Sequence, residues 1–421
     1  MNVLHVNNTD LIGKRFNGFD LIAGLEDKGI HCSQAVLDKQ SDSDAVFSLL
    51  EGQADYVLRS AVDHLERQND ICSVLQPWGR VLSQSEAFRS ADVVHYHLIH
   101  NGLVSLLDLP WLTALKPSIW TFHDPWPLTG HCLYPPRGCD GWSSDCAACP
   151  YPDEPYELSC AGAAKMWQVK RAVYEQLDVD IVVASEYMRD MVRRSPLGGC
   201  FPQVHLIPFA SPDYIAPMNA EECRRELGLS SDSFVILVRA TTLEKKGFSQ
   251  FLDALRLAPP ARPMTILTVD QEGLVPELGP GYQVQEHGWV GDQFYNRLLS
   301  ACDVLVMPSV SEAFGLMAIE AMSVGRAVIC YEGTSLPSVT HAPECGIAVP
   351  NSDVGHLREA IDWAAANPED VRRRGELGRE IVKKEYGEER YLGQLADLYG
   401  AVVERHKLDS SLAATRTTIC D

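Results

Sequence analysis

Short apolar segments rich in Val and Ile alternate with amphipathic segments along nearly the whole chain. Such runs are typical of strands buried on both faces, in parallel sheets that helices cover. Eight segments are predicted strands: residues 3–6, 92–97, 118–122, 180–185, 234–240, 264–270, 303–309 and 327–332. The alternation therefore predicts an α/β fold built from doubly wound sheets.

The series of strands occurs twice. The first set ends near the segment 204–219, which carries three prolines and reads as a connector, and a new set begins at Phe234. We therefore predict one Rossmann-like domain over residues 1–208 and a second over residues 209–385.

The last part of the chain is predicted to be a helix followed by a loose tail. Residues 386–408 place apolar side chains at helical spacing, so one face should pack on another element, and we expect that element to be the N-terminal domain. Residues 409–421 are small and polar, and fraying is expected there.

Charge and hydropathy exclude some functions. The 421 residues carry a net charge of −21, which argues against nucleic acid as a partner and against general adhesion to an anionic membrane. The start of the sequence shows no signal peptide, and no apolar run approaches the ~18 residues of a membrane span. We expect a cytoplasmic protein with at most peripheral contact with the inner membrane.

The most informative segment is 303–329, a predicted strand followed by a helix that Ser311 can cap. Phe314, Gly315 and Leu316 would sit at the helix start, where free N–H groups and the helix dipole favour an anion. Glu320 lies within an apolar helix and needs donors. Sugar hydroxyls would serve, and so would an Arg or a backbone N–H in the core.

This segment resembles the E-x7-E signature of retaining glycosyltransferases of family 4, with Glu312 and Glu320 as its two carboxylates. The resemblance implies a GT-B fold, in which two Rossmann-like domains face each other across a cleft. It also implies that Glu312 faces the sugar of a nucleotide-sugar donor and that Glu320 binds the ribose hydroxyls. The amides of residues 314–316 would hold sugar and phosphate oxygens.

Two further motifs of the second domain resemble the same family. In VRATTLEKKGF, Lys246 matches a Lys that holds the leaving diphosphate, while Arg239 matches less closely and Lys245 is an alternative. A surface pair is the other explanation for the two lysines. In EHGWVGD, backbone groups near Trp289 and Val290 would read the nucleotide base.

The N-terminal half carries the acceptor-side motifs. By the resemblance, His123 in TFHDPWPLTGHC hydrogen-bonds the donor sugar, and Gly13 lets the backbone approach the phosphate in an otherwise atypical loop. His95 and His97 alternate along one predicted strand and share a face. A metal site there is the alternative, but catalytic zinc normally has three convergent ligands.

Four cysteines form a cluster spaced C-x6-C-x6-C-x2-C. The terminal C-x2-C is typical of a zinc knuckle, so Cys132, Cys139, Cys146 and Cys149 are candidate ligands of a structural Zn²⁺. Free thiols and disulfides are the alternatives. The surrounding segment resembles a subgroup of family 4 enzymes from bacterial polysaccharide assembly.

Together these features predict a retaining glycosyltransferase that needs no cofactor or metal for catalysis. The donor would be a UDP- or GDP-sugar, and the acceptor a saccharide or lipid-linked saccharide. A small-molecule acceptor and a non-catalytic nucleotide-sugar-binding protein are the alternatives.

Overall fold

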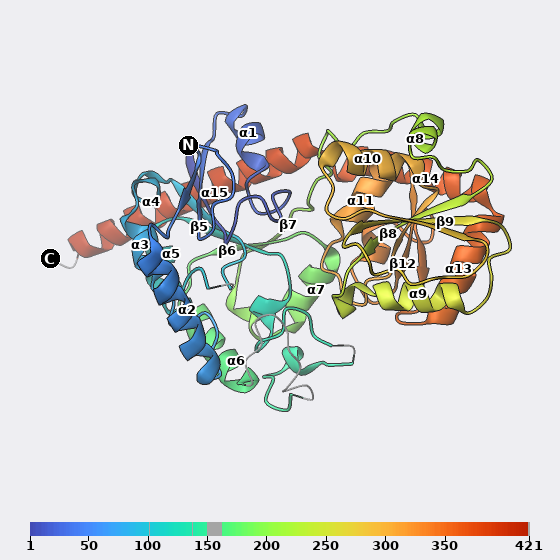
Figure 1. Ribbon diagram of the computed structural model, residues 1–421. Helices are drawn as coiled ribbons and strands as arrows, with labels where there is room; N and C mark the ends of the chain where they lie inside the picture. The colour runs from blue at the N-terminus through green and yellow to red at the C-terminus, as the bar shows by residue number, and fades with distance from the viewer. Residues whose placement is uncertain (101, 137, 150–161, 420–421) are drawn as a thin grey trace. The chain divides into compact units, whose positions relative to one another are not determined.

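The structure is a computed structural model that describes residues 1–100, 102–136, 138–149 and 162–419 (Figure 1). The chain divides into two compact units. The first comprises Met1–Ile207 and Tyr391–Asp421, and the second comprises Pro208–Arg390.

The first unit is built on a seven-stranded sheet in the order β3-β2-β1-β4-β5-β6-β7. Every neighbouring pair is parallel. The strands are β1 (Asn2–Val6), β2 (His31–Val36), β3 (Val46–Ser48), β4 (Val93–Tyr96), β5 (Ser118–Phe122), β6 (Asp180–Val183) and β7 (Val204–Leu206). The central strands β4, β5 and β6 are buried along their whole length, which explains why their sequences do not alternate between apolar and polar.

Helices connect these strands. They are α1 (Leu21–Glu26), α2 (Gln53–Gln68), α3 (Trp78–Gln84), α4 (Glu86–Ser90), α5 (Leu109–Leu115), α6 (Ala163–Tyr174) and α7 (Glu186–Arg194). Ser85 and Ser185 begin α4 and α7, because each hydroxyl accepts a hydrogen bond from a backbone N–H three residues on.

The long C-terminal helix α15 (Glu388–Ile419) lies beside the N-terminal elements of the first unit (Figure 1). Leu395 and Tyr399 are fully buried, and the Tyr399 hydroxyl lies 2.8 Å from His95 Nδ1 on β4. Leu392 packs so closely on Gly24 of α1 that a Cβ there would lie 2.5 Å from its side chain. At its C-terminal end, α15 extends past the predicted range 386–408.

The second unit is built on a six-stranded sheet in the order β10-β9-β8-β11-β12-β13, again parallel throughout. Its strands are β8 (Phe234–Ala240), β9 (Met264–Asp270), β10 (Tyr282–Glu286), β11 (Val304–Met307), β12 (Ala327–Tyr331) and β13 (Ile347–Val349). One apolar core joins residues of β8, β9, β11 and β12 to side chains of the covering helices.

The covering helices are α8 (Ala220–Glu226), α9 (Phe248–Arg256), α10 (Asp292–Ala301), α11 (Leu316–Ser323), α12 (Leu336–Val339), α13 (Val354–Ala366) and α14 (Pro368–Glu385). Asn219 and Asp353 cap α8 and α13 through their side-chain oxygens. α14 packs on α11 and β12. This approach depends on Gly375, where a Cβ would lie 2.0 Å from the carbonyl oxygen of Gly325.

The predicted fold class, two doubly wound α/β domains, is confirmed. All eight predicted strands exist. Five further strands were not predicted: β2, β3, β7, β10 and β13. All but β2 are edge strands, and short or half-exposed strands carry a weaker apolar signal. No helix in the described part of the chain has the length and apolar character that a bilayer crossing requires.

Each sheet reverses its winding at one point. Chain order jumps between β1 and β4 in the first unit and between β8 and β11 in the second. In open α/β sheets, ligands bind beyond the carboxyl ends of the strands at such switch points. The topology therefore selects two places for functional side chains, one in each unit.

Candidate functional site

At the switch point of the second unit, the loop after β8 presses against the segment after β11. Gly247 has a φ of 68°, and a Cβ there would lie 1.8 Å from the carbonyl oxygen of Pro308. The Val310 N–H donates to the carbonyl of Lys245 at 2.9 Å. Because only glycine allows this contact, the Lys-Lys-Gly sequence fixes the loop against the end of the neighbouring strand.

This packing brings together the two residues predicted to serve the donor. Lys246 Nζ lies 2.8 Å from Glu312 Oε2, and the Ser309 hydroxyl donates to the same oxygen at 3.3 Å. The Lys246 and Glu312 side chains are 15% and 9% exposed. The pairing compensates two charges that would otherwise be costly to bury, and it holds the carboxylate in one orientation. Lys246 therefore belongs to a mostly buried ion pair, which the explanation of the two lysines as a surface pair does not account for.

The helix that follows begins later than predicted. α11 starts at Leu316 with Gly315 as its N-cap residue, so the expectation that Ser311 caps it is wrong. Gly315 has a φ of 100°, and a Cβ there would lie 2.4 Å from Leu336. Phe314 is buried, with its ring packed against that of Phe209.

Glu320 lies on α11 and is completely buried. The Tyr295 hydroxyl donates to its Oε2 at 2.9 Å. A partner within the core was one of the two alternatives for Glu320, but this partner is a tyrosine rather than an arginine or a backbone N–H. Tyr295 was not predicted as a site residue, since it lies on α10 at no recognisable spacing from the motif.

The remaining predicted donor residues lie around the same edge of the sheet. Arg239, near the end of β8, donates to Asp270 on the adjacent strand β9 at 2.8 Å. Trp289 is 80% exposed, and Val290 beside it is half-buried. The loop before them is fixed, because the Gly288 N–H donates to Glu272 Oε1 at 2.9 Å.

At the switch point of the first unit, four histidines gather at the ends of β1, β4 and β5. His5 on β1 pairs in register with His95 on β4, while His97 and His123 directly follow β4 and β5. His5, His95 and His97 are at most 1% exposed, and His123 is partly buried. Burial lowers the pKa of His5 to about 4 and that of His123 to about 3, so both imidazoles are neutral at pH 7.

His5, His95 and His97 bring three ligand atoms within 4.8 Å of one another, the one such group among the described residues. The rings of His95 and His97 are stacked, with centroids 4.2 Å apart and planes at 28°. Imidazole lone pairs lie in the ring plane, so stacked rings do not aim theirs at a common point. Both nitrogens of His95 also have partners, Tyr399 and Thr121, at 2.8 and 2.7 Å. The group reads as a hydrogen-bonded cluster rather than a metal centre.

Gly13 lies in the N-terminal loop, with a φ of 75°. A Cβ there would lie 2.5 Å from the ring of Phe16, which gives this glycine a packing role in addition to the predicted phosphate contact. Asn17 shapes the loop by donating to the carbonyls of Thr9, Asp10 and Ile12 at 2.8, 2.8 and 3.1 Å.

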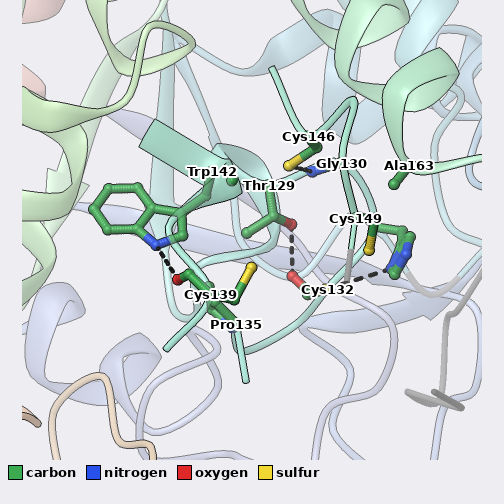
Figure 2. A pocket seen from close by; sticks show the side chains of 11 residues that line it. Thr129, Gly130, Cys132, Pro135, Cys139, Trp142, Cys146, Cys149 and Ala163 are labelled. Carbon is green, nitrogen blue, oxygen red and sulfur yellow. Dashed lines mark hydrogen bonds between the residues drawn. The ribbon is translucent and has the colours of Figure 1, made fainter. Parts of the chain in front are cut away.

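The four clustered cysteines line one pocket, together with His131 and Trp142 (Figure 2). All four are free thiols, so the disulfide alternative is wrong for them. Burial and the neighbouring thiols raise the pKa of Cys132 to about 12. The Gly130 N–H donates to Cys146 Sγ at 3.3 Å. Within the described residues, no three of these sulfurs lie within 4.8 Å of one another, so this arrangement does not itself support a zinc site.

Lys170 on α6, which was not predicted as a site residue, holds the segment between His123 and the first cysteine. Its ammonium group is buried, donates to the carbonyls of Trp126 and Thr129, and lies 3.5 Å from the centroid of the Trp126 ring. Burial lowers its pKa to about 7. A lone lysine in an amphipathic helix gave no signal in the sequence, because such residues usually face solvent.

One region of the chain matches a known protein family. Residues 219–381 match the family described as "Glycosyl transferases group 1". The MMP alpha-(1->4)-mannosyltransferase of Mycolicibacterium hassiacum is 24% identical, over 56% of this chain and 56% of its own length. The alpha-maltose-1-phosphate synthase of Mycolicibacterium smegmatis is 24% identical, over 74% of this chain and 80% of its own. The 2-deoxystreptamine glucosyltransferase of Streptomyces kanamyceticus is 26% identical, over 53% and 59%.

Solved structures share the fold. Sucrose-phosphate synthase from Thermosynechococcus elongatus gives a TM-score of 0.72 at 21% identity, covering 96% of this chain and all of that one. HepE from Anabaena, solved in complex with UDP and glucose, gives 0.66 at 14% identity, covering 95% and 99%. The Lys246–Glu312 pair and α11 thus lie within a glycosyl transferases group 1 region, residues 219–381, of a chain with a glycosyltransferase-like two-domain fold.

Proposed function

We propose that this chain is a glycosyltransferase that moves a sugar from a UDP- or GDP-sugar to a hydroxyl of a glycan or lipid-linked saccharide. The observation that carries the proposal is the Lys246–Glu312 pair. It joins a cation and a carboxylate at the switch point of the second unit, beside the start of α11 and inside the matched family region. The assembly of bacterial surface polysaccharide is the proposed setting.

In this proposal the cationic side chains and the start of α11 hold the diphosphate. Lys246 is the principal cation, with Arg239 or Lys245 beside it. The amides of residues 314–316 add the partial positive charge of a helix N-terminus. A neighbour in fold was solved with UDP, which supports a nucleoside diphosphate as the leaving group.

The nucleoside half of the donor would contact the other predicted residues. Glu320 accepts from the ribose hydroxyls, which requires a movement that exposes its carboxylate beside Tyr295. The loop at Trp289 and Val290 contacts the base, and its exposed indole offers a flat apolar surface for that contact.

The reaction breaks the bond between the anomeric carbon and the phosphate oxygen and forms one to the acceptor oxygen. The electron pair leaves with the diphosphate, and the acceptor proton passes to a phosphate oxygen. Charge builds on both sides of the broken bond, so Lys246 stabilises the leaving group while Glu312 stabilises the developing positive sugar. His123 hydrogen-bonds the transferred sugar. The product keeps the donor's anomeric configuration, and no metal is required.

The test is donor turnover followed by proton NMR in the presence of EDTA, with a panel of UDP- and GDP-sugars and a saccharide acceptor. We expect a product with the donor's anomeric configuration. A product with the opposite anomeric configuration would rule out a retaining reaction. Loss of turnover in EDTA that added Mg²⁺ restores would show that the reaction needs a metal. Binding without turnover of any donor would favour a non-catalytic nucleotide-sugar-binding protein.

A small-molecule acceptor is the second candidate. It is favoured by the similarity to the 2-deoxystreptamine glucosyltransferase, whose name gives 2-deoxystreptamine as its acceptor. Acceptor competition between oligosaccharides and aminocyclitols, measured at a fixed donor concentration, separates the two candidates.

We further propose that the cysteine loop takes up a structural Zn²⁺, with Cys132, Cys139, Cys146 and Cys149 as ligands. The proposal rests on their C-x6-C-x6-C-x2-C spacing in the sequence and on their place around one pocket. The ion would have to draw the sulfurs together and displace thiol protons. Metal analysis of protein purified without chelators tests it: one zinc per chain, lost in Cys146→Ser, is expected, and absence of zinc from the wild type rejects it.

A further inference from the structure

Two cationic side chains flank the end of β8 in the second unit, and a carboxylate from a different neighbouring strand holds each of them. Lys246 bonds to Glu312, which follows β11. Arg239 donates from Nε to Asp270 Oδ2 at 2.8 Å, at the end of β9. β8 lies between β9 and β11 in the sheet. The Arg239–Asp270 pair is thus the counterpart of the Lys246–Glu312 pair on the other side of β8.

Only one nitrogen of the Arg239 guanidinium is engaged. The group carries five N–H donors, on Nε, Nη1 and Nη2. Asp270 takes the donor on Nε, and across the ranges that the structure describes no residue forms a hydrogen bond with Nη1 or Nη2. The Arg239 side chain is 38% exposed. The two terminal nitrogens form a fork that matches two oxygens of a phosphate group, so the arrangement leaves a phosphate-binding fork open.

The backbone at Asp270 has an unusual conformation. Its φ is 93°, a value that few residues other than glycine adopt. Asp270 pairs in register with Ala240, and successive side chains of a strand point to opposite faces, so regular geometry would place Asp270 on the face opposite Arg239. The positive φ breaks that alternation, and the carboxylate reaches Arg239. Backbone strain of this kind persists only where surrounding contacts hold it, and it is concentrated at functional sites.

Hydrogen bonds on both sides hold the chain in this conformation. The Asp270 N–H donates to the carbonyl of Gly288 at 3.2 Å, and the next N–H, that of Gln271, donates to the carbonyl of Ala240 at 3.2 Å. The Gln271 side chain accepts from the Thr242 N–H at 3.2 Å. These bonds tie the end of β9 both to the end of β8 and to the loop after β10. The Asp270 carboxylate, which is 18% exposed, therefore has a fixed position from which to hold Arg239.

The charge of Asp270 is unfavourable for a phosphate site taken alone. A carboxylate repels a diphosphate, so its place beside a candidate phosphate-binding arginine weakens binding unless it has a compensating effect. Fixing the guanidinium before the ligand arrives is such an effect. A long side chain that is already immobilised loses less conformational entropy when it binds.

We propose that Asp270 is a positioning residue, which holds Arg239 through Nε so that Nη1 and Nη2 together bind two oxygens of the donor's diphosphate. The inference rests on the proposed function, from which it takes a nucleoside diphosphate as the ligand at the switch point of the second unit. It adds a second phosphate contact, on the β9 side of the Lys246–Glu312 pair.

The first test is calorimetric titration of the full chain with UDP and GDP. Asp270→Gly removes the carboxylate and accommodates the positive φ without strain. Its affinity for the nucleotide that the wild type binds should fall about tenfold, the effect of one charge-assisted contact, and Arg239→Ala should show the same loss. Charge alone predicts the opposite sign, because the variant removes a group that repels the ligand. An affinity that is unchanged or higher in Asp270→Gly overturns the proposal.

Two further variants separate positioning from other effects. Asp270→Asn keeps an oxygen that accepts from the Arg239 Nε–H, and it should retain most of the wild-type affinity. The double variant Arg239→Ala/Asp270→Gly should bind no more weakly than Arg239→Ala alone, since Asp270 acts only through Arg239. A further loss in the double variant would show that Asp270 acts on the ligand by another route, and would overturn the proposal.

Asp303→Ala is the matched control. Asp303 forms an ion pair of 2.7 Å with Arg224 in the same unit, but it directly precedes β11 and so lies at the opposite end of the strands. Its affinity for UDP and GDP should equal that of the wild type. An equal loss of affinity in Asp303→Ala would mean that general destabilisation is the cause, and would overturn the proposal.

The outcomes for this inference and for the proposed function are distinct. A wild type that binds UDP or GDP but transfers no sugar rejects the proposed function, while the affinities of the variants still decide the role of Asp270. A wild type that transfers sugar, with equal nucleotide affinity in Asp270→Gly, rejects only the positioning role. A wild type that binds neither nucleotide overturns both.

Discussion

Lys246 Nζ lies 2.8 Å from Glu312 Oε2, although 66 residues separate the two along the chain. The contact exists because β8 and β11 are neighbours in the sheet and the loop at Gly247 fits only where no side chain is present. In the proposed reaction these two groups act on opposite sides of the bond that breaks. Their pairing gives each a fixed position before the donor arrives.

Removal of either partner should abolish most of the turnover. Lys246→Ala and Glu312→Ala should each lower kcat by about a hundredfold or more, since each removes electrostatic stabilisation of the transition state. Each should also lower the free energy of unfolding by about 3–5 kcal/mol, because it leaves a mostly buried charge without its partner. The double variant should lose less stability than the sum of the two single variants. Initial rates and chemical denaturation of all three provide the measurement.

Lys383→Ala is the matched control for that series. Lys383 forms an ion pair of 2.7 Å with Glu380 in the same unit, but both side chains are more than half exposed. Its rate and stability should stay close to wild type. A Lys246→Ala variant that behaves like Lys383→Ala would contradict the assigned role.

Tyr295→Phe should weaken donor binding. The variant removes the donor to Glu320 Oε2 and leaves a buried carboxylate short of one hydrogen bond, which costs about 1–3 kcal/mol of stability. If Glu320 binds the ribose, the affinity for UDP should fall as well. Tyr282→Phe is the control, since its hydroxyl donates to the Leu255 carbonyl elsewhere in the unit. Calorimetric titration with UDP that shows equal affinity in both variants would argue against a ribose contact at Glu320.

Arg239→Ala should lower kcat less than Lys246→Ala does. The Arg239 guanidinium already bonds to Asp270 on the next strand and is 38% exposed, so it competes for a diphosphate less directly. We expect a rise in donor KM with a modest change in kcat. Steady-state kinetics at varied donor concentration separates the two, and a loss of kcat as large as that of Lys246→Ala would make Arg239 the principal cation.

Stability should fall as the pH drops from about 6.5 toward 4. Burial depresses the pKa of His5 to about 4 and that of His95 and His97 well below 6.5, so the unfolded chain binds protons in this window while the folded chain does not. Each such histidine removes up to about 1.4 kcal/mol per pH unit, and its contribution is complete above pH 6.5. Urea denaturation followed by tryptophan fluorescence at pH 7.5, 6.5 and 5.5 tests the sign. A stability that stays constant or rises toward pH 5.5 contradicts it.

The central strands could be predicted from the sequence because a strand buried on both faces consists of consecutive apolar residues, and such a run is visible in the local sequence. The sequence also predicted that Glu312 and Lys246 serve one site, through a motif resemblance. Local pattern could not reveal that the two bond to each other, since that contact depends on strand order. Tyr295 and Lys170 were missed for a related reason: each acts on a residue far along the chain, and its own neighbours give no indication of it. The start of α11 was misplaced because Ser311 has the chemistry of a cap, but a left-handed glycine ends the loop four residues later.

We propose that a nucleotide sugar reacts at the Lys246–Glu312 pair. We would follow the donor's anomeric proton signal over time by NMR, with UDP- and GDP-sugars and a saccharide acceptor, for the wild type, Glu312→Ala and Lys383→Ala. We expect the wild type and Lys383→Ala to convert at least one donor to free nucleoside diphosphate and glycoside, and Glu312→Ala to convert none. Conversion by Glu312→Ala at the wild-type rate would contradict it.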